Sequence, residues 1–286
     1  MFKFNLYETI TQKIIASLEK GVIPWRQTWK SSGIPSNFKT GNKYKGVNLL
    51  LLAMENHSVP FYLTFKQAAE LGGRIKKGAK SSLIIYWSLK TRENVDDITK
   101  KETYPVLQYY NVFNITQTEG IDYHSRYQQM EDFSPIPACE EILLRYKDGP
   151  PIEHIEQNAY YNITHDVINL PAPKSFKTEE DYYRVAFHEC IHSTGHPSRL
   201  NRPLTIADSS LYSKEELIAE MGSSFLCGHA RLDPGGLENS AAYIGFWLSQ
   251  LKEDKKYIFS ITGQAQRAVE HILGHSNSYQ KQEAGQ

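Results

Sequence analysis

Apolar residues recur every four positions near the start of the chain, at Leu6, Ile10, Ile14 and Leu18. This spacing places them on one face of a helix over residues 5–20, which Gly21 would end. Apolar or amphipathic runs predict further helices at 48–57 and 64–72. In the second half of the chain, helical spacing predicts more helices, at 139–147, 178–194, 214–231, 241–254 and 261–274.

Strands are predicted in two segments rich in β-branched and aromatic residues, 81–90 and 104–117. The charged sequence ENVDDITKKE between them predicts an exposed hairpin loop. A second hairpin or edge strand pair is predicted at 159–171, in AYYNITHDVINLP. From Glu119 to Pro137 the sequence is polar and without a period, and it ends in FSPIPA, which is typical of a linker.

This pattern predicts an α+β protein of two domains. Residues 1–120 would form a mixed α/β domain, residues 121–137 a linker, and residues 138–286 a mainly helical domain. A chain of 286 residues is long enough for each domain to bury a core of its own.

The net charge of zero hides an asymmetry between these parts. Residues 1–120 contain 17 Lys and Arg against nine Asp and Glu, whereas residues 121–286 contain 15 against 23. The positive excess makes the first part a candidate for binding a polyanion.

The cysteines and the lack of long apolar runs bear on location. Three cysteines occur without any C-x-x-C pair, which argues against a disulfide framework and favours a reducing compartment. The start of the chain lacks the apolar core of a signal peptide, and no apolar run approaches the ~18 residues of a membrane span. We therefore expect a cytoplasmic protein with no membrane partner.

The helix expected at 178–194 contains the pattern H-E-x-x-H within FHECIHSTGH. His188 and His192 lie four residues apart, so their imidazoles share one helix face and can bind one cation. Glu189 lies beside them, where its carboxylate can act as a general base on water. We predict a Zn²⁺ site with Glu189 as the catalytic residue, and another divalent ion such as Mn²⁺ would suit similar ligands.

A catalytic zinc site needs a third protein ligand. His196 continues the four-residue spacing, but Gly195 is expected to break the helix before it. In the next helix, the segment E-x-x-A-E resembles the second-helix signature of gluzincin metallopeptidases. That resemblance implies Glu216 as the third ligand and Glu220 as the residue that holds a histidine. In the alternative, Glu216 forms a capping box with Ser213, and Glu220 binds the metal.

The first 90 residues combine 14 Lys and Arg with 12 aromatic residues and only four acidic ones. Single-stranded nucleic acid suits this mixture, because cations track its phosphates and aromatic rings stack on its unpaired bases. The candidate contacts are Trp25, Arg26, Trp29, Lys43, Tyr44 and Lys45 in one region and Arg74, Lys76, Lys77 and Lys80 in another. In the alternative, the tryptophans fill a core and the lysines only solvate a surface.

Several segments together resemble one known family. PWRQTW at 24–29, TGNKYKGVN at 40–48, TFKQAAELGGRIKKGAKS at 64–81 and YYNVFNITQTEG at 109–120 resemble the N-terminal domain of ArdC-type antirestriction proteins. FHECIHSTGHPSRLNR at 187–202, EELIAEMGSSFLC at 215–227 and AAYIGFWLSQLKEDKKYIF at 241–259 resemble their zincin-like metallopeptidase domain. The segments follow in the same order over nearly the whole chain.

The resemblance implies a conjugation-associated plasmid protein. Its N-terminal domain would bind single-stranded DNA, its C-terminal domain would have a SprT-like metalloprotease fold, and it would shield incoming DNA from restriction. Two other functions fit the same residues. One is a DNA-activated metalloprotease that acts on proteins bound to DNA, and the other is a catalytically silent zincin-like binding module.

Overall fold

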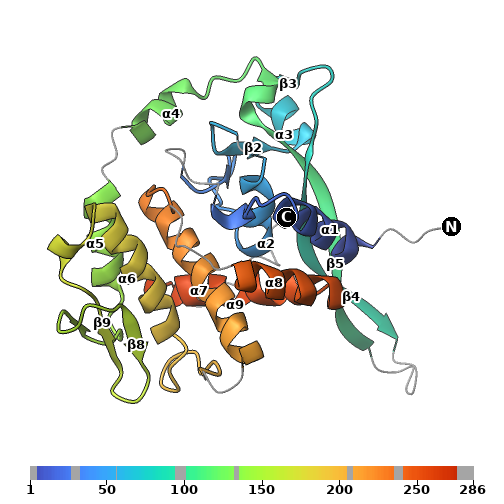
Figure 1. Cartoon of the computed structure of the whole chain (residues 1–286). Coiled ribbons are helices and arrows are strands. Elements are labelled where there is room, and N and C mark those ends of the chain that lie inside the picture. Colours follow the sequence, from blue (N-terminus) through green and yellow to red (C-terminus); the bar gives the residue numbers. More distant parts are fainter. Residues whose placement is uncertain are drawn as a thin grey trace.

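A four-stranded sheet forms the centre of the N-terminal domain (Figure 1). Its strands, in the order β1–β2–β5–β4, are Ser36–Asn37, Phe61–Leu63, Lys101–Asn114 and Ser82–Glu93. The structure is a computed structural model, and it describes residues 5–26, 33–55, 57–93, 101–131, 135–204, 209–234 and 241–275. The two longest strands confirm the predicted hairpin, which pairs Ser82 with Val112 at its base and Glu93 with Lys101 towards its tip.

The helices of this domain begin and end where the sequence supplies caps. In α1, Leu6–Leu18, the Asn5 side chain accepts hydrogen bonds from the first free N–H groups, and Gly21 follows with a φ of 74°. In α3, Phe65–Glu70, Thr64 and Gln67 form a reciprocal capping box. The remaining elements are η1 Pro24–Arg26, α2 Gly46–Ala53, η2 Ile115–Gln117 and the small sheet of β3 Arg74–Ile75 with β6 Thr118–Glu119.

The C-terminal domain is mainly helical, as predicted, so the protein is an α+β protein of two domains (Figure 1). Its helices are α5 Pro135–Arg145, α6 Glu179–Ser193, α7 Ser209–Ala230, α8 Ala241–Glu253 and α9 Tyr257–Ile272. A three-stranded sheet, in the order β7–β9–β8, consists of Ile152–Glu153, Val167–Asn169 and Tyr160–Asn162, with η3 Pro173–Ser175 leading into α6. No helix among the described residues has the length and apolar character needed to cross a bilayer.

One hydrophobic core runs through both domains. Helix α1 packs on α8, and α2 packs on α9. Between them, Trp25 of η1 lies edge to face against Trp247 of α8, with ring centroids 5.6 Å apart. Both tryptophans are buried, and the Ser224 hydroxyl of α7 donates to the carbonyl oxygen of Trp25. The domains are therefore held by shared apolar packing and not only by the chain between them.

The segment predicted as a linker is folded onto the N-terminal domain. It contains α4, His124–Glu131, and the first residues of α5. Tyr127 packs against the apolar cluster around Phe61, and the Arg126 guanidinium donates to the carbonyl oxygen of Phe38 at 2.7 Å. The sequence looks polar and without a period here because these contacts use scattered aromatic and charged side chains, not a continuous apolar face.

Candidate metal centre

Helix α6 presents the two histidines because its opposite face is apolar and buried. Thr178 caps the helix by accepting a hydrogen bond from the N–H of Asp181 at 3.1 Å. Phe187, Cys190 and Ile191 are buried in the core, which leaves the other face of the last turns to His188 and His192. Both predicted histidines therefore lie one turn apart on the same face.

Helix α7 lies very close to α6, and a glycine permits this approach. A Cβ atom at Gly222 would lie 2.7 Å from the Cδ1 atom of Ile191, so a larger residue there would force the Ile191 side chain or the helices to move. The neighbouring Ala219 is also buried. The close approach brings Glu216, one turn and a half earlier on α7, to the histidines of α6.

The three predicted ligands converge. His188 Nε2 lies 3.6 Å from Glu216 Oε2, and His192 Nε2 lies 3.4 Å from Glu216 Oε1. The two Nε2 atoms are 3.1 Å apart, and one ligand atom from each of the three residues fits within 4.8 Å of the others. Two imidazole nitrogens and one carboxylate oxygen at this separation are the donor set of a divalent metal ion with open positions left for other ligands.

Two further residues, Glu215 and Arg202, hold the candidate metal ligands in place. The Nδ1–H of His192 donates to Glu215 Oε1 at 3.3 Å, so the Nε2 atom is left to face the ligand position. Arg202 donates to both oxygens of Glu215, at 3.0 and 2.6 Å. It also donates to the Thr194 hydroxyl at 2.7 Å and to the Ile191 carbonyl oxygen at 2.8 Å. Arg202 therefore ties the end of α6 to α7 behind His192.

The pKa values of these groups reflect the pairing of charges. Burial alone would lower the pKa of His192, but its hydrogen bonds with Glu215 and Glu216 raise that pKa to about 10. Burial would raise the pKa of both carboxyls, yet Arg202 and His192 lower the pKa of Glu215, and the two histidines lower the pKa of Glu216. Both acids are therefore ionised at neutral pH, which is the form that binds a cation.

Glu189 is placed for acid–base chemistry next to the ligands. It follows His188 directly, is 8% exposed, and is near enough to help raise the pKa of His192. A divalent ion held by the three ligands would polarise a carbonyl group and acidify water beside it. The Glu189 carboxylate would then accept and return a proton at that position.

The alternatives for the third ligand are not brought into the cluster. His196 lies in the loop after α6, where its Nδ1 contacts the Ser198 hydroxyl at 2.7 Å. Glu220 is buried one turn beyond Glu216, and the Nδ1 of His188 has no hydrogen-bond partner among the described residues, so Glu220 does not hold that histidine. The capping alternative also fails, because α7 begins at Ser209 and Ser213 lies inside the helix.

Sequence reasoning missed Glu215 and Arg202. The signal for Glu215 was its place beside Glu216, since adjacent positions on a helix point about 100° apart and can reach two sides of one histidine. Nothing in the spacing singles out Arg202, which reaches α7 from a loop.

The first group of predicted DNA contacts is mostly not on the surface. Trp25 is 1% exposed and packed on Trp247, so its ring is not open to a base; the tryptophan fills the core, as in the alternative. Tyr44 is also buried, edge to face with Tyr62, and Lys45 forms an ion pair with Glu270 at 2.7 Å. Lys43 is exposed. Trp29 and the side chain of Arg26 lie outside the described residues.

The second group of predicted DNA contacts is exposed. Arg74, Lys76, Lys77 and Lys80 all lie on the surface around β3. Arg74 pairs with Glu119 at 2.7 Å, and the ammonium group of Lys76 donates to the Thr116 carbonyl oxygen at 2.8 Å. This group therefore keeps its cations accessible to a phosphate backbone.

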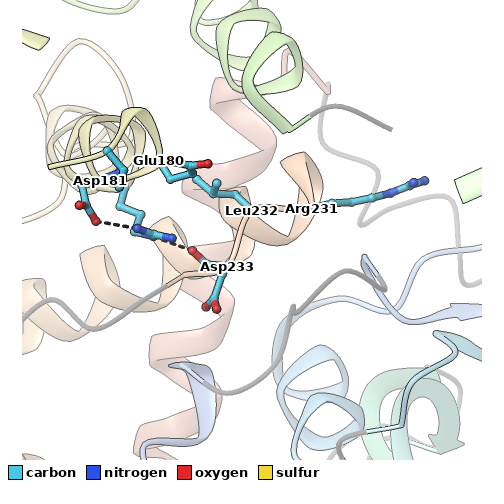
Figure 2. A pocket seen from close by; sticks show the side chains of 7 residues that line it. Glu180, Asp181, Arg231, Leu232 and Asp233 are labelled. Atoms are coloured by element: carbon cyan, nitrogen blue, oxygen red, sulfur yellow. Dashed lines mark hydrogen bonds and ion pairs between the residues drawn. The ribbon is translucent and has the colours of Figure 1, made fainter. Parts of the chain in front are cut away.

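A pocket of about 400 Å³ lies at the other end of α6 (Figure 2). It is lined by Thr178, Glu180, Asp181, Arg184, Arg231, Leu232 and Asp233. Arg184 donates to Asp181 Oδ1 and to the carbonyl oxygen of Asp233, both at 2.6 Å, while Arg231 points away from them (Figure 2). Its central charges satisfy one another, so we assign no function to this pocket.

Two family models match the chain in the same order as its domains. Residues 4–113 match the N-terminal domain of anti-restriction factor ArdC, and residues 138–264 match a zincin-like metallopeptidase family. The metal-free crystal structure of the antirestriction protein ArdC from plasmid R388 is 34% identical, with a TM-score of 0.82, over 95% of this chain and 98% of that chain. The chain belongs to the ArdC antirestriction family.

A second crystal structure of R388 ArdC, bound to Mn(II), gives a TM-score of 0.79 at 33% identity and covers 96% of this chain and 100% of that one. This member of the ArdC family is also similar to two other proteins. Over 95% of this chain it is 33% identical to a DNA primase TraC of Escherichia coli, and over 98% of this chain it is 28% identical to the uncharacterized protein y4eC of Sinorhizobium fredii. The chain spans only 27% and 20% of the two TraC proteins that it matches.

Proposed function

We propose that this protein binds single-stranded DNA without sequence preference and protects incoming conjugative DNA from restriction in the cytoplasm. The observation that carries the proposal is the match to R388 ArdC, which extends over nearly the whole of both chains. The N-terminal domain would bind the DNA, and the zincin-like domain would hold a zinc ion on His188, His192 and Glu216, with Mn²⁺ as a substitute.

The charge of the N-terminal domain supports DNA as the partner. Residues 1–90 carry 14 Lys and Arg against four acidic residues, and the four cations around β3 are exposed. Cations that contact phosphates release condensed counterions, so binding would weaken steeply with salt and depend little on base sequence.

The geometry around Glu189 favours a second candidate function. A buried carboxylate beside a metal-binding histidine pair is the arrangement of a hydrolase, so the zincin-like domain would cleave proteins bound to the same DNA. A protein that only binds through this domain would have no use for Glu189 as a base.

Two assays on the full chain separate these functions. Fluorescence anisotropy with labelled oligothymidine at several salt concentrations measures DNA binding in the wild type and in Glu189→Gln. We expect salt-dependent binding in both, and a wild type that fails to bind at low salt contradicts the proposal. Conjugation of an unmodified plasmid into a restricting host then measures protection. Protection that survives Glu189→Gln places the function in DNA binding, whereas protection lost with full DNA affinity identifies the hydrolase.

A further inference from the structure

Three aromatic residues from distant parts of the sequence meet on one surface. Trp87 of β4 lies next to Tyr7 of α1, with ring centroids 6.4 Å apart, and Tyr7 lies edge to face with Phe259 of α9 at 4.8 Å. We name these three residues the aromatic surface. It joins the N-terminal domain to the last helix of the C-terminal domain, and the β4–β5 hairpin continues outward from it (Figure 1).

Trp87 is exposed although a large apolar ring is normally buried. It is 43% exposed, whereas Trp25 and Trp247, the other tryptophans in the described part of the chain, are 1% and 0% exposed. Folding therefore gains little from Trp87, and its ring face is free to contact another molecule.

Cations lie around these rings. The ammonium group of Lys256 lies 5.4 Å from the ring centroid of Tyr7, and within the described residues no acidic side chain pairs with it. The neighbouring Lys255 forms an ion pair with Glu8 at 2.8 Å. An ammonium group with no acidic partner among the described residues attracts a phosphate, and here it lies over the half-buried ring of Tyr7, next to the exposed ring of Trp87.

The outer hairpin repeats the combination on its other face. Lys90 of β4 is paired in register with Tyr104 of β5, so the two side chains lie side by side on one face. Tyr86, on the same face, is 41% exposed, and Tyr104 is 38% exposed. Two exposed rings and one lysine therefore lie along this face of the hairpin.

From these contacts we propose that the aromatic surface is a stacking site for unpaired bases of single-stranded DNA, with the ring of Trp87 against a base and Lys256 against a phosphate. The site rests on the proposed DNA binding and specifies where the bases contact the protein. Stacking on a ring does not depend on base identity, which agrees with binding that is indifferent to sequence. The strand would then contact both domains and not the N-terminal domain alone.

The test compares Trp87→Ala with the matched variant Leu89→Ala. Leu89 lies two residues further on the same strand and face and is 54% exposed, but it has no ring. In oligothymidine anisotropy titrations we expect Trp87→Ala to weaken binding roughly 5- to 150-fold, the effect of losing one base–aromatic stack, and Leu89→Ala to change it little. Trp87→Phe keeps a stacking face and restores most of the affinity. Lys256→Gln lowers the slope of log K against log salt by about 0.7, the loss of one phosphate contact.

Tryptophan fluorescence gives a second readout that does not depend on affinity. Oligothymidine should quench the emission of the wild type, and this quenching should be much smaller in Trp87→Phe although that variant still binds. Wild-type affinity in Trp87→Ala, or equal quenching in Trp87→Phe, overturns the stacking site while leaving DNA binding intact. If Trp87→Ala instead changes the oligomeric state in light scattering and not the DNA affinity, the surface is a protein contact and the proposal is wrong. A wild type that binds no DNA refutes the proposed function itself.

Discussion

The metal centre and the aromatic surface are built in opposite ways. At the metal centre, the side chains of His188, His192 and Glu216 are at most 17% exposed, and Glu215 and Arg202 hold them from behind. On the aromatic surface, Trp87 is 43% exposed and lies beside the ring of Tyr7. The first site is preorganised before anything binds, and the second gains its main contacts only when a partner arrives.

This difference indicates how each site acts. A metal ligand set must keep its geometry, because a shift of a few tenths of an ångström in one donor changes the coordination. A stacking surface can adapt, because a base can lie on the face of an aromatic ring in several orientations. Substitutions at the metal centre should therefore affect binding and structure together, whereas those on the aromatic surface should affect binding alone.

Removing a metal ligand gives the largest expected effect. His188→Ala leaves one imidazole and one carboxylate, so metal affinity should fall by more than the roughly 100-fold that loss of a supporting residue costs. The matched control is His196→Ala, a histidine of the same helix–loop segment whose Nδ1 contacts Ser198. Metal content measured by mass spectrometry after dialysis should fall in the first variant and stay at the wild-type level in the second. Equal loss in both variants contradicts the assignment of Glu216 as third ligand.

Trp25 in the core and Trp87 on the surface should contribute differently to the free energy of unfolding. Trp25→Ala opens a cavity against Trp247 in the shared core and should cost about 3–5 kcal/mol of unfolding free energy. Trp87→Ala removes an exposed ring and should cost about 0.5 kcal/mol. Urea unfolding of the metal-loaded proteins measures both. A large loss in Trp87→Ala would show that its ring stabilises the fold, and its effect on DNA binding could then not be attributed to stacking.

The two histidines of the candidate metal site could be predicted from their four-residue spacing, whereas Glu216 was predicted from the resemblance of E-x-x-A-E to the gluzincin second-helix signature. His188 and His192 lie on one predicted helix and Glu216 on the next, and the glycine at 222 that lets the helices approach is visible in the sequence. The hairpin and α1 were equally accessible, since β-branched and aromatic residues are enriched in both strands and a four-residue apolar pattern repeats along the helix.

The burial of Trp25 could not be read in the same way. Its environment is fixed by Trp247, more than two hundred residues later, and no local pattern distinguishes a tryptophan in a packed loop from one on a surface. The aromatic surface could not be predicted for the same reason, since Tyr7, Trp87 and Phe259 come from three elements that meet only in the folded chain. Composition indicated a DNA-binding domain, but the positions of the rings depend on tertiary packing.

Glu215→Gln tests whether the support behind His192 matters. The amide of the variant still occupies the space, and its carbonyl oxygen can still accept from the imidazole N–H, but it lacks the negative charge that strengthens that hydrogen bond and balances the charge of Arg202. We expect metal affinity to fall roughly 10- to 100-fold. Glu220→Gln, the same change one turn beyond the ligand, should leave metal affinity unchanged in calorimetric titrations. Reversed outcomes would assign the supporting role to Glu220.

The dependence of metal affinity on pH follows from the proton on His192. The pKa of His192 is raised to about 10 in the metal-free protein, above its ordinary value of 6.5, so the stabilisation by this proton is complete below pH 6.5 and is lost as the pH rises through 10. A metal ion must displace that proton. Affinity should therefore increase roughly tenfold per unit between pH 7 and 9.

Glu215→Gln removes one of the three carboxylates that raise the pKa of His192, so the same titrations should give a flatter slope in this variant. The aromatic surface provides the internal comparison, because oligothymidine affinity of the wild type should change little over the same pH range. A metal affinity that is constant from pH 7 to 9 in the wild type would mean that His192 is already neutral before the metal binds. In that case Glu215 orients the imidazole through its hydrogen bond without keeping it charged.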